Sequence, residues 1–125
     1  MSIIEIKNVS KIYKKGNNEV LSLNKVSLNV KDGEILALMG PSGSGKTTLM
    51  NLIAGIDYPT AGEIFVAGEE ISKLKSRRLS NWRTRSIGYI FQLYHLVPVL
   101  TAFENVEKII NTNNFKYNNY EQFNF

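Results

Sequence analysis

Residues 40–48 read GPSGSGKTT. The first eight of them match the phosphate-binding pattern G-x-x-x-x-G-K-[S/T] at every fixed position. Because glycine has no Cβ, the backbone here can adopt tight conformations that direct several N–H groups toward one anion. Lys46 adds a cation that can follow the β- and γ-phosphates of a nucleotide, and the hydroxyl of Thr47 can ligate Mg²⁺. The stretch therefore predicts a site that holds a nucleoside triphosphate by its phosphates.

The residues on either side of this stretch fit a phosphate site. Residues 35–39, ILALM, are all apolar, which is typical of a strand buried on both faces in a parallel sheet. Residues 47–56 carry apolar side chains at helical spacing, and Gly55 and Pro59 end that pattern. A helix that begins near Thr47 would direct the positive end of its dipole at the loop. Strand, glycine-rich turn and helix together disfavour a chance glycine-rich turn.

Strands are predicted before this segment, and both strands and a helix after it. Residues 4–30 largely alternate apolar and polar side chains, with a break at 16–18, which favours antiparallel strands with one solvated face. A strand is expected at 64–66, a helix over about 72–84, and a further short strand at 87–91. The order of elements indicates an α/β fold.

The last part of the chain contains a helix start and an atypical tail. Thr101, with Glu104 three residues later, forms a capping box that predicts a helix from Ala102. Residues 111–125 contain six Asn and five aromatic residues, and no Leu, Val, Ile, Ala or Gly. Asn is a poor helix former and core-filling aliphatic residues are missing, so we expect this tail to be disordered or loosely attached. One partial domain is therefore expected over residues 1–110.

The composition limits the function classes. A chain of 125 residues allows one domain at most and excludes a large two-lobed enzyme. The absence of Cys excludes disulfides and thiolate nucleophiles, and it fits a reducing cytoplasm best. No signal peptide is expected, because Glu5 and Lys7 interrupt the apolar residues near the start. The longest apolar run, residues 35–39, is far shorter than the roughly 20 residues that cross a bilayer.

Six basic residues gather between residues 73 and 85, a stretch without acidic residues, in a chain of formal net charge +4. They are Lys73, Lys75, Arg77, Arg78, Arg83 and Arg85. Such a cluster can bind nucleic acid or lipid headgroups, but no series of aromatic residues accompanies it for stacking on bases. A solvated helical face is the favoured interpretation, and no nucleic-acid partner is expected.

Residues 3–106 resemble the nucleotide-binding subunit of ATP-binding cassette (ABC) transporters, within the branch that serves lipoprotein release, macrolide export and antimicrobial-peptide efflux. The blocks that carry the resemblance are VSKIY at 9–13, residues 40–50 with LIAG at 52–55, PTAGEI at 59–64, IGYIFQ at 87–92 and LTAFENV at 100–106. Five blocks in order are more specific than the phosphate loop alone. The resemblance implies an incomplete P-loop NTPase (ABC ATPase) fold, with an N-terminal antiparallel β subdomain and the first part of the RecA-like parallel-sheet core.

The resemblance implies ATP and Mg²⁺ as ligands. The nucleotide-binding positions carried over from the family, including its Walker A loop, are Tyr13, Gly40, Pro41, Ser42, Gly43, Ser44, Gly45, Lys46, Thr47 and Thr48. Tyr13 falls where the family places an aromatic ring that stacks on adenine, although the residues alone leave an ordinary strand tyrosine open. Gln92 falls on the Q-loop, which in the family reaches Mg²⁺ and the attacking water; without the family it would be a solvated loop glutamine. The candidate catalytic residues are thus Lys46 and Gln92, and the candidate metal ligands are Thr47 and Gln92.

The resemblance also implies partners. They are a transmembrane permease subunit and a second ATPase subunit in a homodimer, with the chain cytoplasmic and peripheral on the inner face of the cell membrane. The loop 93–100 is rich in apolar side chains and would help to dock the permease, with local core packing as the open alternative. We expect His95 to be an ordinary loop residue, because the family's switch histidine comes much later. Glu69 and Glu70 fall in the antiparallel subdomain and are not expected to be catalytic.

Groups that hydrolysis requires are missing from these residues. Transfer of a phosphoryl group to water needs carboxylates that hold Mg²⁺ and polarise the water, and a group that stabilises charge on the γ-phosphate. In the family these come from the Walker B Asp-Glu, a switch His and the LSGGQ signature of a second copy, none of which occurs here. The match fades after Glu107, so we expect a truncated chain, through a premature stop, a frameshift or an incomplete gene model.

Two hypotheses follow for the function. The first is the ATP-binding subunit of an ABC transporter that powers export, represented by its N-terminal portion and not hydrolytically competent alone, so enzyme status stays open. The second is a non-catalytic nucleotide-binding fragment or pseudogene product. A small phosphate-loop kinase or GTPase is disfavoured, because such enzymes lack the N-terminal strand block and the Q-loop. In the truncated chain the apolar faces of 35–39 and 87–91 would be partly uncovered.

Overall fold

The computed structural model describes residues 2–90 and 96–110. The chain divides into two units, residues 1–79 and residues 80–125. The tail predicted to be disordered falls outside the described residues. Among the residues that are described, no helix is long and apolar enough to cross a membrane.

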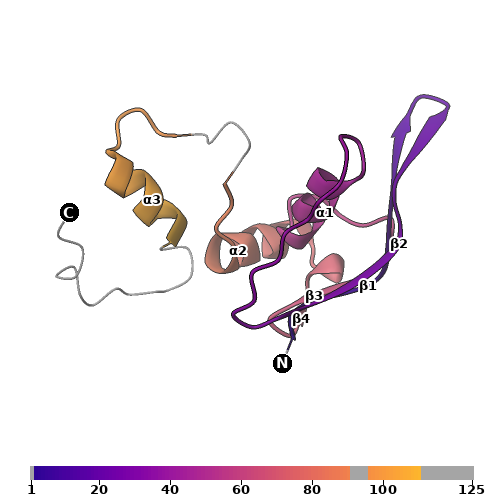
Figure 1. The fold of residues 1–125 in the computed structure, drawn as a ribbon, viewed down its shortest axis with the longest axis horizontal. Coiled ribbons are helices and arrows are strands. Elements are labelled where there is room, and N and C mark those ends of the chain that lie inside the picture. The colour runs from indigo at the N-terminus through magenta and orange to yellow at the C-terminus, as the bar shows by residue number, and fades with distance from the viewer. Residues whose placement is uncertain (1, 91–95, 111–125) are drawn as a thin grey trace. The chain divides into compact units, whose positions relative to one another are not determined.

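The first unit begins with a long antiparallel hairpin (Figure 1). β1 (Ser2–Lys15) pairs with β2 (Asn18–Lys31), and Gly16 lies in the turn between them with a φ of +61°. The register places Ile6 opposite Leu28. Both the predicted break in the pattern and the two predicted antiparallel strands are confirmed.

Two further strands extend the hairpin into a four-stranded antiparallel sheet of order β2-β1-β3-β4. β3 (Ala61–Val66) pairs with β1, and β4 (Glu69–Glu70) pairs with β3. Gly62 has a φ of +92°, and a Cβ on it would lie 2.5 Å from the carbonyl oxygen of Asn8 and 2.6 Å from Cα of Val9. Only glycine therefore fits where β3 crosses the irregularity in β1. The predicted placement of residues 69 and 70 in the antiparallel sheet is confirmed.

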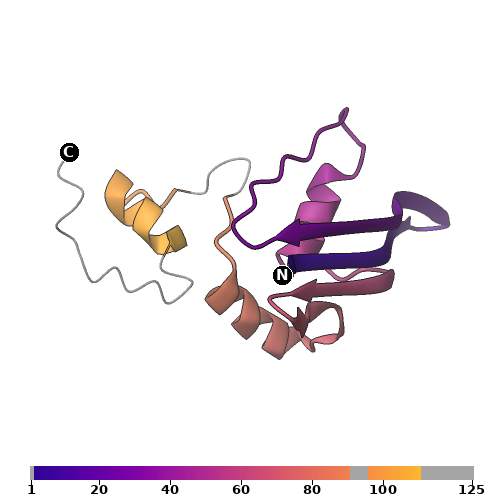
Figure 2. The same ribbon diagram turned by 60° about the horizontal axis from the view of Figure 1, so that its bottom comes forward.

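One helix covers one face of this sheet (Figure 2). α1 (Lys46–Ile53) is shorter than the helix predicted over 47–56, because Gly55 adopts a left-handed φ of +68° just after it. The buried core of the unit includes Ile6, Val9, Leu49, Leu52 and Ile64. Full burial of each such side chain contributes about 1.5–3 kcal/mol, so packing of α1 on the sheet holds this unit together.

Neither the parallel-sheet strand predicted at 35–39 nor the short strand predicted at 87–91 forms among the described residues. Residues 34–40 have no strand pairing, and Ile35 and Met39 are 98% and 90% exposed. Residues 87–90 are irregular as well. A strand buried on both faces needs neighbours that pair its N–H and C=O groups, and the described strands all pair within the antiparallel sheet. The prediction of a strand at 35–39 is therefore wrong, whereas the predicted exposure of its apolar side chains is confirmed.

The helix predicted over about 72–84 forms in two pieces. A 3-10 turn, η1 (Ile71–Lys73), precedes α2 (Ser76–Ser86). Leu79 and Trp82, three residues apart on α2, are both buried. Exposed side chains on the same helix include Arg77, Arg78 and Arg85. This division into a buried apolar pair and an exposed basic face agrees with the solvated helical face predicted for the basic stretch.

The second unit contains α3 (Ala102–Ile110), which begins at the predicted residue. The N–H of Thr101 donates to Oε2 of Glu104 at 2.7 Å, and the N–H of Glu104 donates to Oγ1 of Thr101 at 3.2 Å. These reciprocal bonds confirm the predicted capping box. Asn105 fixes the preceding loop, since its Oδ1 accepts from the N–H of Val97 at 2.9 Å and its Nδ2 donates to the carbonyl of Thr101 at 2.9 Å.

Candidate phosphate-binding site

The glycine-rich loop depends on close packing at two of its glycines. A Cβ on Gly40 would lie 2.7 Å from Oγ of Ser44, and a Cβ on Gly45 would lie 2.6 Å from the carbonyl oxygen of Ser22 on β2. Gly45 also has a φ of +91°, and Gly43 a φ of +80°. A side chain at Gly45 would push the loop away from β2, whereas the hydroxyl next to Gly40 belongs to a side chain that can rotate. Gly45 therefore requires glycine for both backbone conformation and space, and Gly43 for backbone conformation.

The loop leads directly into the N-terminus of α1. Gly45 is the N-cap residue, no side chain caps this helix end, and the first turn carries no acidic residue. The first helical hydrogen bond runs from the N–H of Leu49 to the carbonyl of Gly45 at 2.9 Å. The first N–H groups of a helix have no acceptor within the helix and carry partial positive charge. This end of α1 is therefore suited to an anion.

Lys46 folds back across the loop. Its Nζ donates to the carbonyl oxygen of Gly40, to that of Pro41 at 2.9 Å and to Oγ of Ser44 at 3.5 Å. These acceptors are all neutral. Phosphate oxygens bind an ammonium group more strongly, because both partners are then charged. An anion in the loop can therefore draw the ammonium of Lys46 away from the carbonyls and into direct contact.

The two threonines after Lys46 have different surroundings. Thr47 is exposed. Thr48 is half-buried, and its Oγ1 lies 2.7 Å from Oγ of Ser22 on β2. This hydrogen bond and the contact between Ser22 and Gly45 join the start of α1 to β2. Ser22 was not among the predicted site residues, because nothing in a strand pattern marks a serine that faces a loop more than twenty residues away.

Tyr13, predicted as an adenine-stacking residue, lies in a cluster that the sequence did not predict. Its hydroxyl donates to Oδ2 of Asp57 at 3.3 Å, while Nζ of Lys11 donates to Oδ1 of Asp57 at 3.1 Å and to the carbonyl of Tyr58 at 2.7 Å. Nζ of Lys11 also lies over the ring of Tyr13, 5.1 Å from its centroid. The residue Tyr13 is 39% exposed. One face of its ring is thus next to a cation.

The carboxylate of Asp57 is stabilised in its ionised form. Partial burial by itself would raise its pKa, but the N–H of Tyr58, the hydrogen bond and charge of Lys11, and the hydroxyl of Tyr13 together lower the pKa of Asp57 below its ordinary value. Near neutral pH the carboxylate is therefore charged and accepts from all three groups.

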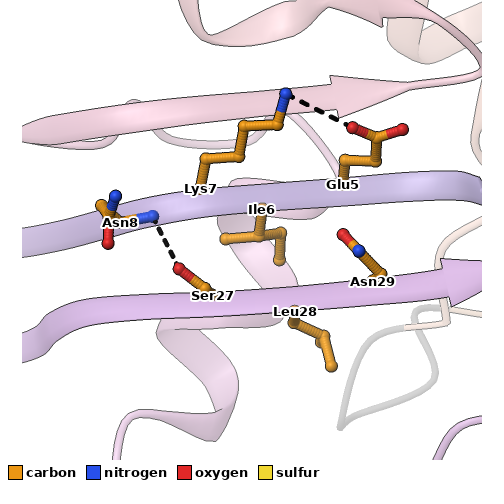
Figure 3. Close-up of a pocket in the computed structure, with 7 residues that line it drawn as sticks. All are labelled: Glu5, Ile6, Lys7, Asn8, Ser27, Leu28 and Asn29. Atoms are coloured by element: carbon orange, nitrogen blue, oxygen red, sulfur yellow. Dashed lines mark hydrogen bonds and ion pairs between the residues drawn. The ribbon is translucent and has the colours of Figure 1, made fainter.

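A shallow groove lies elsewhere in the first unit, between β1 and β2 (Figure 3). It has a volume of about 410 Å³ and is lined by Glu5, Ile6, Lys7, Asn8, Ser27, Leu28 and Asn29. Lys7 pairs with Glu5 at 3.5 Å, and the N–H of Asn8 donates to Oγ of Ser27 at 3.0 Å. These polar groups satisfy one another, and no predicted site residue lines the groove.

Two predicted features are not tested by this geometry. Gln92 and His95 lie outside the described residues. The described residues contain no group of three or more His, Cys, Asp or Glu side chains that could hold a metal ion. Within the described residues, the predicted positions from Gly40 to Thr48 come together as one loop and helix start.

The arrangement of antiparallel sheet, glycine-rich loop and helix corresponds to a known family. The model of the ABC transporter family matches residues 23–124. The chain belongs to the ABC transporter family. The resemblance inferred from five short blocks is thereby confirmed.

Three ABC transporter relatives illustrate the match. The uncharacterized ABC transporter ATP-binding protein MJ0796 of Methanocaldococcus jannaschii is 45% identical over 105 residues, which are 84% of this chain and 45% of that protein. The lipoprotein-releasing system ATP-binding protein LolD of Alcanivorax borkumensis is 42% identical over 104 residues, 83% of this chain and 46% of that protein. The macrolide export ATP-binding/permease protein MacB of Mannheimia succiniciproducens is 44% identical over 106 residues, 85% of this chain and 16% of that protein.

A solved structure places the fold in the same family. The dimeric post-hydrolysis state of the ATP-binding cassette MJ0796, bound to ADP and Pi, matches with a TM-score of 0.76 and 43% identity, over 86% of this chain and 46% of that chain. The chain thus spans less than half the length of MJ0796 and of LolD. Its fold is an incomplete P-loop ATPase fold of the ABC type, as predicted.

Proposed function

We propose that this chain is the nucleotide-binding part of an ABC transporter ATP-binding subunit and that it binds Mg-ATP through residues 40–48, its Walker A loop. The observation that carries the proposal is the conjunction at Gly45. There a left-handed glycine packs on the carbonyl of Ser22, the uncapped end of α1 begins, and the ammonium of Lys46 lies on the same loop. A structure 43% identical to the chain holds ADP and Pi, which supports the same ligand class here.

Different residues of the loop contact different parts of the bound Mg-ATP. Backbone N–H groups from Ser42 to Thr48 surround the phosphate oxygens, and Lys46 follows the β- and γ-phosphates. Thr47 is exposed, and its hydroxyl is a hard oxygen donor that fits Mg²⁺, which takes few protein ligands when it is bound together with phosphates. When bound, Mg²⁺ would neutralise charge on the β- and γ-phosphates.

Two further residues complete the proposed site. Tyr13 stacks on adenine with the ring face opposite Lys11. Gln92 is the second Mg²⁺ ligand and contacts the attacking water, so Lys46 and Gln92 are the proposed catalytic residues. No Walker B pair or signature sequence occurs in the 125 residues, so we propose that these residues alone bind ATP without turning it over.

The proposed partners are a transmembrane permease and a second ATPase subunit, with the chain held at the inner face of the membrane by the permease. MacB is named as an ATP-binding/permease protein, and the MJ0796 structure is a dimer. In the loop proposed to dock the permease, Leu96 and Val99 are 67% and 89% exposed. This exposure favours docking over the alternative of local core packing.

The test is equilibrium binding of Mg-ATP to the 125-residue chain and to Lys46→Ala. Loss of the lysine should weaken binding by about tenfold or more, equivalent to about 1.4 kcal/mol. Lys75→Ala removes another lysine with an exposed side chain outside the loop and should change binding by less than about twofold. Absence of saturable binding, or equal affinities of the two variants, would contradict the proposal. ATP turnover that Lys46→Ala abolishes would contradict the proposed lack of hydrolysis.

A further inference from the structure

The cluster around Tyr13 joins two segments that are far apart in the sequence. Lys11 and Tyr13 lie on β1, whereas Asp57 follows α1 by four residues. The two oxygens of the Asp57 carboxylate are divided between them: Oδ1 accepts from Lys11 at 3.1 Å, and Oδ2 accepts from Tyr13 at 3.3 Å. A single carboxylate therefore sets the position of both side chains.

Lys11 is held at three places. Nζ contacts Asp57, donates to the carbonyl of Tyr58 at 2.7 Å and lies 5.1 Å from the ring centroid of Tyr13. Its side chain is only 13% exposed, so its attraction to the ring acts in a partly desolvated place. The ammonium occupies one face of the ring. A planar group that stacks on Tyr13 must therefore use the opposite face.

Asp57 is in turn fixed to α1. Its N–H donates to the carbonyl of Asn51 at 3.4 Å, and the N–H of Ile56 donates to the same carbonyl at 2.9 Å. Asn51 belongs to the last turn of α1, and the phosphate loop enters the first turn. An eight-residue helix of about 12 Å therefore separates the loop from the segment that holds Tyr13.

We propose that Asp57 and Lys11 are positioning residues for the adenine base: through Tyr13 they orient its stacking platform and fix that platform to the helix that carries the phosphate loop. The inference rests on the proposed function, because it requires a nucleotide in the loop. Its specific content is that the hydroxyl of Tyr13 matters as well as the ring. A tyrosine that only stacks would tolerate the loss of its hydroxyl.

The experiment compares ATP with inorganic tripolyphosphate, each with Mg²⁺, because the second ligand has phosphates but no base. Tyr13→Phe keeps the ring and loses the bond to Asp57, and Asp57→Asn loses the charge that holds Lys11. Each should weaken ATP binding by about three- to tenfold and change tripolyphosphate binding by less than about twofold. The double variant should bind ATP no more weakly than the poorer single variant, because both changes break the same cluster of Lys11, Tyr13 and Asp57.

Tyr58→Phe is the matched control. Tyr58 contacts the cluster only through its main-chain N–H and C=O, which the substitution keeps. Its hydroxyl donates to the carbonyl of Leu74 at 2.8 Å instead, so loss of the hydroxyl should leave the ratio of the two affinities unchanged. An equal loss of ATP and tripolyphosphate affinity in Tyr13→Phe and Asp57→Asn would show a structural role and overturn the inference. So would unchanged ATP affinity in both variants.

Binding of the two ligands to the wild-type chain distinguishes failure of the inference from failure of the proposed function. If it binds tripolyphosphate as tightly as ATP, the base contributes nothing; the inference then fails and the phosphate site stands. If it binds neither ligand, the proposed function fails and the inference fails with it. Tighter binding of ATP than of tripolyphosphate, lost in the two variants and kept in Tyr58→Phe, supports both.

Discussion

Gly45→Ala should destabilise the fold far more than an equivalent change two residues earlier. Gly45 has φ +91° and ψ 7°, a left-handed conformation that costs an alanine about 1–2 kcal/mol. The new Cβ would also lie 2.6 Å from the carbonyl oxygen of Ser22 and 2.9 Å from Cδ2 of Leu23. The first of these atoms is backbone, so β2 itself must move, and such overpacking costs about 1–3 kcal/mol more.

Gly43→Ala provides the matched control. Its φ of +80° imposes a similar conformational cost, but a Cβ there would meet nothing within 4 Å. The difference between the two variants therefore isolates the clash with β2. Urea unfolding followed by circular dichroism measures it, as the shift in midpoint multiplied by the common slope. Gly45→Ala should be less stable than Gly43→Ala by about 1–3 kcal/mol. Agreement of the two within about 0.5 kcal/mol would refute the proposed packing of the loop on β2.

Three further outcomes are expected. The backbone N–H and the hydroxyl of Thr101 lower the pKa of Glu104 below its ordinary value of 4.5. The ionised Glu104 therefore stabilises α3 above pH 4.5, and this contribution is lost as the pH falls through the lower pKa of Glu104 in the folded chain. Glu104→Gln should remove that part of an acid titration followed by circular dichroism. Ser22→Ala breaks the 2.7 Å bond to Thr48 and should lower the unfolding free energy by about 0.5–1.5 kcal/mol in urea. Trp82→Ala, which empties a buried site, should lower it by about 3–5 kcal/mol, whereas Arg78→Ala on the exposed face should change it by less than about 0.5 kcal/mol.

Features set by neighbouring residues were predicted well. The capping box at Thr101 and Glu104, the hairpin turn at Gly16 and the alternation along β1 and β2 each depend on contacts that the local pattern specifies. The same holds for the tight backbone predicted in the glycine-rich loop, which forms as left-handed conformations at Gly43 and Gly45. The fold was predicted from the resemblance to ABC ATPases, because the five blocks that carry the resemblance can be recognised in the sequence itself.

Features set by distant partners were not predicted. Asp57 and Lys11 are 46 residues apart, and neither stands out in composition or spacing, so their ion pair could not be foreseen. The prediction of a strand at residues 35–39 failed for a related reason. An apolar run indicates that a segment would be buried if it were paired, but pairing depends on neighbouring strands, which the described residues do not supply at that place.

The glycine-rich loop at 40–48 keeps its form although the segment before it, residues 34–39, has no strand pairing. The loop is supported from its C-terminal side: Ser22 and Leu23 on β2 surround Gly45, Oγ of Ser22 bonds Thr48, and buried Leu49 and Leu52 anchor α1 in the core. None of these supports comes from residues 34–39, which enter the loop mostly exposed and without strand pairing. Changes on β2 should therefore affect phosphate binding more than equal changes in the segment before the loop, although that segment is nearer in sequence.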